Sequence, residues 1–316
     1  MRYSIGIDVG GTNLKAGVVD ESDRLIYTKK IPLRPFADKE EFAEILLTLT
    51  RDVAAEADIS LADVAWVGVG FPGIVDNDRG IVVHITNIAI DDLDLRSVYE
   101  ERLHLPLYLG NDANCAALGE YYAGVGKGTH SLVVITLGTG VGGGIVVNGK
   151  MIEGYNMTGA EVGHIVIVPH GKKCNCGRSG CYERYAAATA LIEQTVEAME
   201  AHPDSLLWEV AGGKTQNVGG KTPFDAARRG DPVAKEVCET YIDYVALGAA
   251  NLINVIEPEV LAFGGGVSAQ EDLMAPLTEK ITRESFGYGR GVPMTKITRC
   301  SLGNDAGIIG AAMLGK

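Results

Sequence analysis

The sequence has little positive charge, and its basic residues form no cluster along the chain. Its 28 lysines and arginines are outnumbered by 41 aspartates and glutamates, so the net charge is −13 at pH 7. Proteins that bind a phosphate backbone need basic patches, and we therefore expect no nucleic-acid partner. Long apolar runs are also missing, because no stretch reaches the length of a membrane span. We expect no membrane association.

The chain also lacks the pattern of a secretory leader. Its first residues lead directly into an apolar strand pattern, without a charged segment followed by an apolar one. Cysteine is scarce, at six residues, and three of the six are grouped, which fits a reducing compartment. We therefore expect a soluble cytoplasmic protein. With 316 residues, 46% of them hydrophobic, the chain can form one large domain or two of ordinary size.

The grouped cysteines stand close to a histidine. His164, Cys174, Cys176 and Cys181 fall within eighteen residues. Three thiolates and one neutral imidazole are a common tetrahedral ligand set for Zn²⁺. We predict that these four residues bind a structural zinc ion. The alternatives are a disulfide or unrelated buried thiols, and the absence of a leader disfavours the disulfide.

Apolar periodicity predicts alternating strands and helices, which indicates an α/β fold. Strands are expected at 3–8, 14–20, 25–33, 64–71, 81–85, 107–110, 131–137, 141–148, 260–264 and 297–301. Helices are expected at 38–57, with Asp38 as its N-cap, and at 95–102, 113–122, 183–200, 231–256, 271–285 and 305–314. Residues 203–222, which carry two Gly-Gly pairs, are expected to form an excursion on the surface.

One pattern occurs twice. Residues 6–20 and 137–148 each contain a strand, a glycine turn with a threonine, and a second strand with paired valines. A repeat at this separation predicts two related α/β halves. We expect the halves to face each other, with their glycine turns lining a cleft.

Three glycine turns follow predicted strands: Gly10-Gly11-Thr12, Gly138-Thr139-Gly140 and Gly264-Gly265-Gly266. Glycine allows positive φ and lets a phosphate approach backbone N–H groups. The first turn is not a P-loop, because no Gly-Lys-Ser/Thr follows, and it leads into a strand and not into the helix of a dinucleotide site. One such turn could be an ordinary hairpin. Together, the three predict a nucleotide site.

These motifs resemble the ROK family of bacterial sugar kinases, and more narrowly its glucokinases. The resemblance spans nearly the whole chain and rests on residues 8–13, 70–76, 111–114, 137–143, 161–164 and 174–183. It implies a two-domain actin-like ATPase (ribonuclease H-like) fold with an interdomain cleft. The smaller domain would comprise residues 1–113 plus about 304–316, and the larger would comprise 114–303 and carry the zinc motif. Because the chain begins at the first glycine turn, we expect a kinase and not a repressor with an added helix-turn-helix.

The resemblance implies ATP-dependent phosphorylation of a hexose, first of all glucose, at its 6-hydroxyl. Asp112, which follows a strand and opens a helix, matches the family's catalytic aspartate, although Asp at that place can also serve as a helix cap. Asp8 is expected to hold Mg²⁺, or alternatively to stabilise its turn. Lys15 either approaches the phosphates or lies on a solvated face. We predict nucleotide and phosphate contacts from Asp8, Gly10, Gly11, Thr12, Asn13, Lys15, Gly138, Thr139, Gly140, Gly264, Gly265 and Gly266.

The sugar contacts implied by the resemblance are Gly73, Asn87, Asn111, Asp112, Glu161, His164 and Glu183. His164 would place one ring nitrogen on zinc and the other toward the sugar. For Glu183 the alternative is a favourable charge in the first turn of a helix, and for Glu161 a surface acid. Family glucokinases commonly follow the asparagine with a proline and an aromatic residue, whereas this chain has Asn87-Ile-Ala-Ile-Asp91. We expect the sugar pocket to differ at that wall.

Several alternatives stay open. Within the enzymes, the substrate could be N-acetylmannosamine, N-acetylglucosamine, allose or fructose. Outside them, the chain could be a non-catalytic sugar-sensing protein or an actin-like filament ATPase, and the cysteine motif disfavours the filament. The family habit also predicts a homodimer or a higher homo-oligomer.

Overall fold

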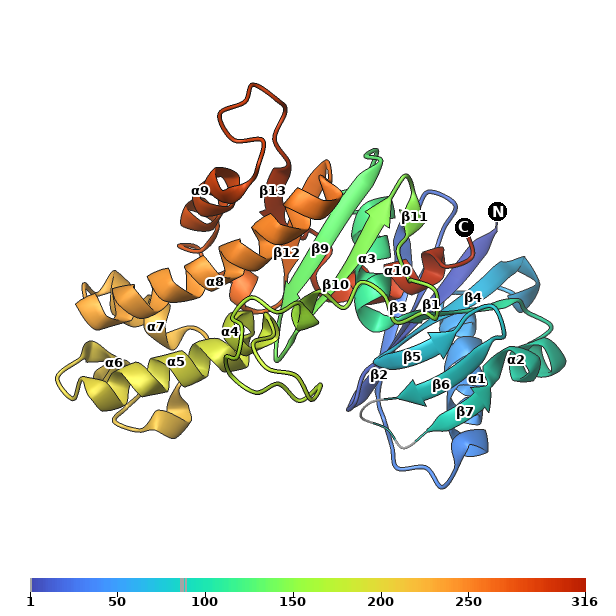
Figure 1. The fold of residues 1–316 in the computed structure, drawn as a ribbon. Coiled ribbons are helices and arrows are strands. Elements are labelled where there is room, and N and C mark those ends of the chain that lie inside the picture. The colour runs from blue at the N-terminus through green and yellow to red at the C-terminus, as the bar shows by residue number, and fades with distance from the viewer. Residues whose placement is uncertain (1, 86–87, 89) are drawn as a thin grey trace. The chain divides into compact units, whose positions relative to one another are not determined.

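A computed structural model describes residues 2–85, 88 and 90–316 (Figure 1). The contacts between residues divide the chain into two compact units. The first comprises Met1–Ser131, Gly144–Ala160 and Ser301–Lys316, and the second comprises Leu132–Gly143 and Glu161–Cys300. These bounds differ from the expected domains 1–113 plus 304–316 and 114–303, because 114–131 and 144–160 lie with the first unit. Among the described residues, no helix combines the length and the apolar character that crossing a membrane requires.

A five-stranded sheet forms the centre of the first unit, in the order β3-β2-β1-β4-β8. Its strands are β1 (Tyr3–Val9), β2 (Asn13–Val19), β3 (Leu25–Pro32), β4 (Val64–Phe71) and β8 (Leu107–Asn111). The pairs β1–β2 and β2–β3 are antiparallel, whereas β1–β4 and β4–β8 are parallel. The three strands predicted between residues 3 and 34 are confirmed. The carboxyl ends of β1, β4 and β8 therefore share one edge.

One face of this sheet is covered by α1 (Lys39–Glu56), with α2 (Leu95–Leu103) beside it. The predicted N-cap is confirmed, because the Asp38 side chain accepts a hydrogen bond from the backbone N–H of Glu41. Ile5 and Ile7 of β1 and Phe42 of α1 are fully buried in one apolar core. Their burial holds the helix against the sheet.

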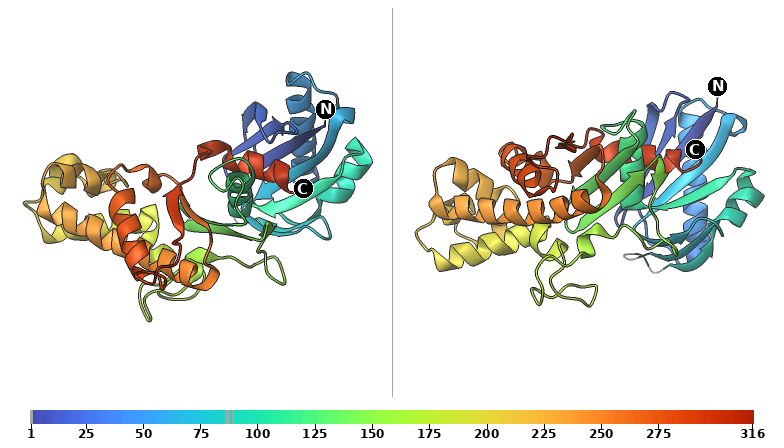
Figure 2. Two further views of the ribbon diagram at one scale, coloured as in Figure 1. Left: turned by 90° about the horizontal axis from the view of Figure 1, so that it is seen from above. Right: turned by 45° about the horizontal axis from the view of Figure 1, so that its top comes forward.

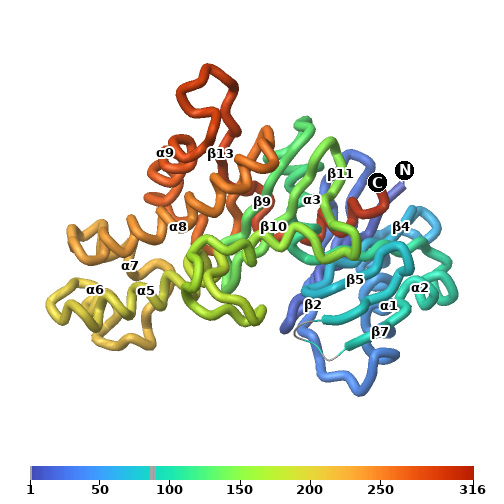
Figure 3. Tube along the Cα trace, viewed as in Figure 1, coloured from blue at the N-terminus to red at the C-terminus, as the bar shows by residue number. Residues whose placement is uncertain are grey.

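The other face carries α3 (Asp112–Tyr122) and α10 (Ala306–Met313), which pack closely on each other and on β1 and β4. Glycine makes this approach possible. A Cβ at Gly6 would lie 1.9 Å from the carbonyl oxygen of Ile308, and one at Gly310 would lie 1.6 Å from that of Cys115. The two ends of the chain both belong to this unit (Figure 3), where Lys316 pairs with Asp23.

Replacing Gly310 by Ala is expected to lower the melting temperature by roughly 5 °C, because the new methyl group forces α3 and α10 apart. Calorimetry provides the measurement. Gly219→Ala is the matched control, since nothing lies within 4 Å of a Cβ at that position. If the two variants melt together, the close packing of α3 on α10 contributes no stability.

A small antiparallel sheet also belongs to the first unit. It contains β5 (Gly73–Asp76), β6 (Ile81–Ile85) and β7 (Asp91–Asp94), in that order. Only β6 was predicted. Strands β5 and β7 have four residues each and just one buried side chain apiece, so they carry almost no alternating pattern.

The second sheet has the order β11-β10-β9-β12-β13. Its strands are β9 (Ser131–Leu137), β10 (Val141–Val147), β11 (Lys150–Met151), β12 (Val260–Gly264) and β13 (Lys296–Arg299). The pairs β9–β12 and β12–β13 are parallel and β10–β11 is antiparallel. Strand for strand, this order repeats that of the first sheet, as the sequence repeat predicts.

Six helices belong to the described part of the second unit, and α5 lies alongside α8 in it (Figure 2). They are α4 (Glu183–Ala186), α5 (Ala188–Ala201), α6 (Leu206–Val210), α7 (Thr222–Arg228), α8 (Pro232–Ile256) and α9 (Met274–Glu284). The described residues of both units also contain the 3₁₀ turns η1 (Leu61–Asp63), η2 (Val162–His164), η3 (Thr215–Asn217), η4 (Val267–Ala269) and η5 (Gly303–Asp305).

Two predictions about this region are wrong. The helix expected at 183–200 is broken, because Ala187 is extended, with φ −69° and ψ 161°. The segment 203–222 is not a surface excursion. Leu207, Ala211 and Val218 are buried with Met199 in an apolar cluster, and this burial draws the segment inward.

Candidate active site

The candidate catalytic residues of the first unit lie where its parallel strands end. In register, Asp8 of β1 stands beside Gly70 of β4, and Gly70 stands beside Gly110 of β8. Asn111 and Asp112 follow directly. Strands are spaced about 4.8 Å apart, so the backbones of Asp8 and Gly110 are on the order of 10 Å apart. Asp8 and the Asn111-Asp112 pair therefore follow strand ends at the same edge of the sheet.

Helix capping at this edge is performed by Asn111. Its Oδ1 accepts from the N–H groups of Ala113 and Asn114, at 3.0 and 3.2 Å, while Asp112 is the first residue inside α3. Asp112 Oδ1 also accepts from Ala113 N–H, at 2.8 Å. The alternative that Asp112 is merely the cap is therefore not supported. The amide oxygen of Asn111 is occupied, and its Nδ2 donates to the Gly73 carbonyl at 3.3 Å, which leaves one amide hydrogen for a sugar.

Asp8 is held in a half-buried position. Burial raises the pKa of Asp8, and the charge of Lys15, whose Nζ lies 3.8 Å from Asp8 Oδ2, offsets part of that rise. A Cβ added to Gly307 of α10 would lie 3.1 Å from the Asp8 carboxyl carbon, so glycine leaves room for the carboxylate. A partly desolvated carboxylate is stabilised in its charged form by a nearby cation, and a carboxylate oxygen is a ligand that suits Mg²⁺.

The first glycine turn is a tight hairpin. Gly10 N–H donates to the Asn13 carbonyl at 3.0 Å, and Leu33 N–H donates to the Thr12 carbonyl at 2.9 Å. The Thr12 hydroxyl accepts from Asn13 Nδ2 at 2.8 Å. Lys15 Nζ lies 3.8 Å from Asp8 Oδ2 and donates to the Asn304 carbonyl at 3.3 Å. Its contact with the phosphates stays a prediction.

A third carboxylate, Glu153, acts electrostatically on the same buried thiol as Asp8 and Asp112, and the sequence reasoning missed it. Burial raises the pKa of the Cys115 thiol, and the charges of Asp112, Asp8 and Glu153 raise it further. Burial also raises the pKa of Glu153, with a contribution from Asp78. No local motif marks Glu153; only its position eight residues before Glu161 could have drawn attention to it.

Of two predicted sugar contacts from the first unit, the structure describes only Gly73. Gly73 opens β5, where a Cβ would lie 2.1 Å from the His84 carbonyl oxygen, so only glycine fits. Asn87 lies outside the described residues. Both stay predictions.

In the second unit, the two other glycine turns lie side by side. Gly264 is paired with Thr136 where β12 and β9 end. Gly265 has φ +82°, and a Cβ there would lie 2.4 Å from the Leu137 carbonyl oxygen. The turn Gly138–Gly140 is fixed to α5, because Ala188 N–H donates to the Gly138 carbonyl and the Thr189 hydroxyl to that of Thr139, both at 2.8 Å. Their exposed backbone groups can meet a phosphate.

Glu183 is tied to the same turn. Its Oε2 accepts from Val141 N–H at 3.0 Å, and a Cβ at Gly140 would lie 2.3 Å from that oxygen. The other oxygen, Oε1, lies 4.0 Å from Cys174 Sγ. The Glu183 side chain therefore lies between the glycine turn and the cysteine cluster. It makes specific contacts besides placing a negative charge in the first turn of α4.

The four predicted metal ligands come together. The ligand atoms of His164, Cys174, Cys176 and Cys181 all lie within 4.8 Å of one another. Cys176 Sγ and Cys181 Sγ are 3.6 Å apart, and Cys174 Sγ is 3.7 Å from His164 Nδ1. Two sulfurs on one tetrahedral Zn²⁺ lie about 3.8 Å apart, whereas a disulfide spans about 2.05 Å. The donor set and spacing fit zinc, and the cysteines form no disulfide.

The segment between β10 and the cluster carries Glu161 and His164. Gly163 packs against β10, where a Cβ would lie 2.1 Å from the Val141 carbonyl oxygen. His164 N–H donates to the Glu161 carbonyl at 3.0 Å, and the Glu161 side chain is exposed. Since Nδ1 of His164 faces the cluster, Nε2 is the nitrogen that could meet a sugar.

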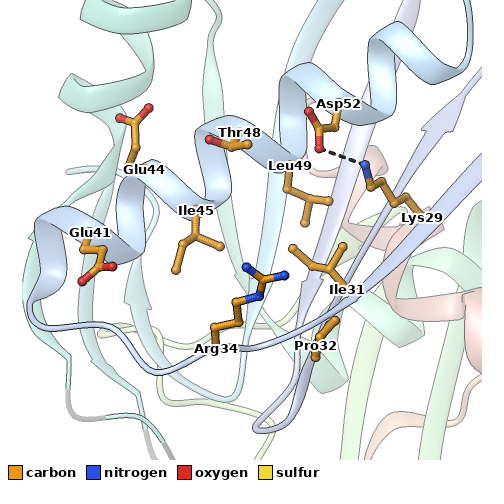
Figure 4. A pocket seen from close by; sticks show the side chains of 10 residues that line it. All are labelled: Lys29, Ile31, Pro32, Arg34, Glu41, Glu44, Ile45, Thr48, Leu49 and Asp52. Atoms are coloured by element: carbon orange, nitrogen blue, oxygen red, sulfur yellow. Dashed lines mark hydrogen bonds and ion pairs between the residues drawn. The ribbon is translucent and has the colours of Figure 1, made fainter.

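A separate cavity of about 470 Å³ lies between α1 and β3 (Figure 4). Its apolar floor includes Ile31, Ile45 and Leu49, and Lys29 at its rim pairs with Asp52 at 2.8 Å. None of the predicted site residues lines it. The candidate site residues therefore lie elsewhere, at the strand ends of the first unit and, separately, at the glycine turns of the second.

Comparison with known proteins decides the family. The sequence profile of the ROK family matches residues 4–316. The chain belongs to the ROK family. The resemblance on which the sequence analysis rests is confirmed.

Among the relatives of this ROK protein, a glucokinase of Halalkalibacterium halodurans is 35% identical over 100% of this chain and 95% of its own length. A xylose repressor of Caldicellulosiruptor bescii is 28% identical, covering 89% of this chain and 70% of that protein. The structure of a Streptomyces griseus ROK glucokinase with glucose and AMPPNP is 36% identical, with a TM-score of 0.78 over 99% of this chain and 98% of that one. The predicted fold class, a two-domain actin-like ATPase fold, is confirmed.

Proposed function

We propose that this ROK protein transfers the γ-phosphoryl group of ATP to the 6-hydroxyl of glucose, giving glucose 6-phosphate and ADP. Full-length relatives named glucokinases support this function, and one of the similar structures holds glucose and AMPPNP. The single observation that carries it in this chain is Asp112, the first residue of α3, at the strand edge shared with Asp8.

Asp112 is the proposed general base. Its carboxylate takes the proton of the 6-hydroxyl as that oxygen attacks the γ-phosphorus, and ADP leaves. Asn111 holds the start of α3 and offers its remaining amide hydrogen to a sugar oxygen. Asn111 caps the helix, so the Asp112 carboxylate is not needed for capping. As the first residue of α3, Asp112 has a backbone position fixed by the start of that helix.

The proposed nucleotide contacts come from the glycine turns. Backbone N–H groups at Gly10–Asn13, Gly138–Gly140 and Gly264–Gly266 meet phosphate oxygens. Asp8 holds Mg²⁺, which when bound neutralises phosphate charge. Lys15 supports Asp8 from the side, since its ammonium group bridges that carboxylate and the Asn304 carbonyl.

The proposed sugar contacts are Gly73, Asn87, Asn111, Asp112, Glu161, His164 and Glu183. Carboxylates accept hydrogen bonds from sugar hydroxyls, and Nε2 of His164 meets another hydroxyl. Oε2 of Glu183 is already bonded to Val141 N–H, so Oε1 is the oxygen proposed to accept from the sugar. A rejected sugar that lacks a matching hydroxyl leaves one of these groups unpaired, which costs affinity.

The cysteine cluster is proposed to hold a structural Zn²⁺, whose four protein ligands leave no open position. The metal, when bound, fixes the loop that carries Glu161, His164 and Glu183. We further propose a cytoplasmic homodimer or higher homo-oligomer. Exposed apolar side chains near one end of α8, among them Val255 and Phe286 at 80% and 73% exposed, are candidates for the contact.

Turnover on a sugar panel tests this function. ADP release is coupled to a spectroscopic assay with ATP, Mg²⁺ and glucose, N-acetylglucosamine, N-acetylmannosamine, allose or fructose. We expect glucose to give the highest kcat/KM, at least tenfold above the other sugars, because a site built for given hydroxyls rejects analogues that lack them. A higher kcat/KM for another sugar would replace glucose as the substrate.

The non-catalytic alternative has its own signature. One of the similar proteins is a xylose repressor, which supports keeping a regulator as the alternative. A sugar sensor would bind glucose in calorimetry and release no ADP with any sugar of the panel. That combination of results would overturn the kinase.

A further inference from the structure

A buried carboxylate in α3 has no role in the proposed chemistry. Glu120 is 0% exposed and lies eight residues after Asp112 on the same helix, about 12 Å along its axis. In the described part of the chain it forms no ion pair with a lysine or arginine. A carboxylate buried without a cation needs several hydrogen-bond donors to offset the loss of water.

Glu120 receives those donors from one short segment and one turn. Its Oε1 accepts from Ser301 N–H and Leu302 N–H, both at 2.8 Å. Its Oε2 accepts from the Ser301 hydroxyl and from Val125 N–H, both at 3.1 Å. Three of the four donors belong to residues 301 and 302, which lie 181 and 182 positions away in the sequence. The contact is therefore long-range and specific to this segment.

This segment is where the chain passes from the second unit into the first. On its second-unit side, Cys300 N–H donates to the Phe263 carbonyl at 2.9 Å, immediately before the glycine turn Gly264–Gly266. On its first-unit side it leads through η5 into α10. The proposed nucleotide turn and the proposed catalytic helix are thus connected through two residues that Glu120 holds.

The same segment has a second anchor. Lys15 Nζ donates to the Asn304 carbonyl at 3.3 Å and lies 3.8 Å from Asp8 Oδ2. Residues 301 and 302 are therefore bound to α3, the helix that begins with Asp112. Asn304 is bound to Lys15, whose ammonium group lies beside Asp8. Both anchors lie in the first unit.

We propose that Glu120 is a positioning residue: it fixes Ser301–Leu302, where the chain enters the first unit, against the helix that begins with Asp112. The inference rests on the proposed function, because it concerns the arrangement in which ATP and sugar react. An ionised carboxylate accepts from all four donors, whereas an amide presents a nitrogen that cannot accept. Glu120→Gln keeps the size and shape of the side chain, but its amide nitrogen cannot accept the two hydrogen bonds that one carboxylate oxygen accepts.

The test compares two buried carboxylates. Glu120→Gln is expected to lower kcat by about tenfold at a temperature where the variant is fully folded, with KM for either substrate changing less, because a small misplacement of reacting groups slows the chemical step. Asp231→Asn is the matched control. Asp231 is 4% exposed and accepts from Ala234 N–H at 2.7 Å and the Ser205 hydroxyl at 3.0 Å, all within the second unit. We expect this control to lose thermal stability and keep kcat within about twofold of the wild type.

A second readout separates positioning from stability. Small-angle scattering of the wild-type chain with glucose and AMPPNP is expected to show compaction relative to the free protein. Glu120→Gln should show less of it, and Asp231→Asn the full amount. A Glu120→Gln variant with wild-type kcat and full compaction would overturn the proposal and leave Glu120 a stability residue. If the wild type turns over none of the sugars, the proposed function fails, and compaction alone then decides the role of Glu120.

Discussion

Replacing Asp112 by Asn is expected to lower kcat by about 10³-fold, because a general base contributes roughly 10² to 10⁴ to such a reaction. An amide cannot accept the proton of the 6-hydroxyl at neutral pH. The change keeps the size of the side chain, and the cap of α3 is supplied by Asn111, so the helix start survives. Glucose affinity, measured by calorimetry, should change by less than about tenfold, because ground-state contacts with the sugar are shared among several residues.

The control for this variant is Asp94→Asn. Asp94 stands at the start of α2 in the same unit, where its side chain accepts from Ser97 N–H at 3.1 Å. Both substitutions remove one charge near a helix start, but we expect only the one at Asp112 to affect kcat. A folded Asp112→Asn variant with near-normal turnover would show that another group takes the proton, and Glu153 would be the first candidate.

Replacing Cys181 by Ser is expected to remove the bound metal and at least 90% of kcat/KM. Cys181 is fully buried, and its sulfur lies 3.6 Å from that of Cys176. Hydroxyl oxygen is a far weaker zinc ligand than thiolate, and a structural zinc contributes directly to folding. Glu183 follows two residues later, so loss of the metal releases a proposed sugar contact. Elemental analysis is expected to find about one zinc per wild-type chain and much less in the variant.

Cys238→Ala is the matched control for the metal. Cys238 is also buried, at 7% exposed, but it lies on α8 and is not a member of the four-residue cluster. This variant should keep its zinc and most of its turnover. Prolonged chelation of the wild type should reproduce the effect of Cys181→Ser, and added zinc should reverse it. Full activity of a metal-free preparation would show that the cluster has no part in catalysis.

Spacing within a short stretch of sequence allowed the most specific predictions. His164 and the three cysteines lie within eighteen residues, and the structure brings their ligand atoms within 4.8 Å. The repeated strand, turn and strand likewise predicts two sheets with the same order, because each copy is a local hairpin. In both cases the residues that act together are near neighbours in the sequence.

What the sequence could not predict depends on contacts between distant segments. Nothing near Glu120 indicates that its partners are residues 301 and 302. Nothing near Ala187 indicates a break between α4 and α5. There, Ala188 N–H donates to the carbonyl of Gly138, fifty residues earlier in the chain. The glycines of the segment 203–222 predict a surface loop. Leu207 and Val218 are instead buried, because they pack against apolar side chains of neighbouring helices, among them Met199.

The order of the segments has a consequence for synthesis on the ribosome. The second unit uses residues 132–143 and 161–300, whereas the first requires the stretch Ser301–Lys316, whose helix α10 packs against α3, β1 and β4. During translation the first sheet emerges early and waits, with the face that Gly6 and Gly68 offer to α10 uncovered, until nearly all of the remaining chain has been made. At elongation rates of about 5 to 20 residues per second, that interval is on the order of tens of seconds. A chain truncated after residue 300 and released from the ribosome should therefore contain a protease-resistant second unit and a first unit that is still open to cleavage.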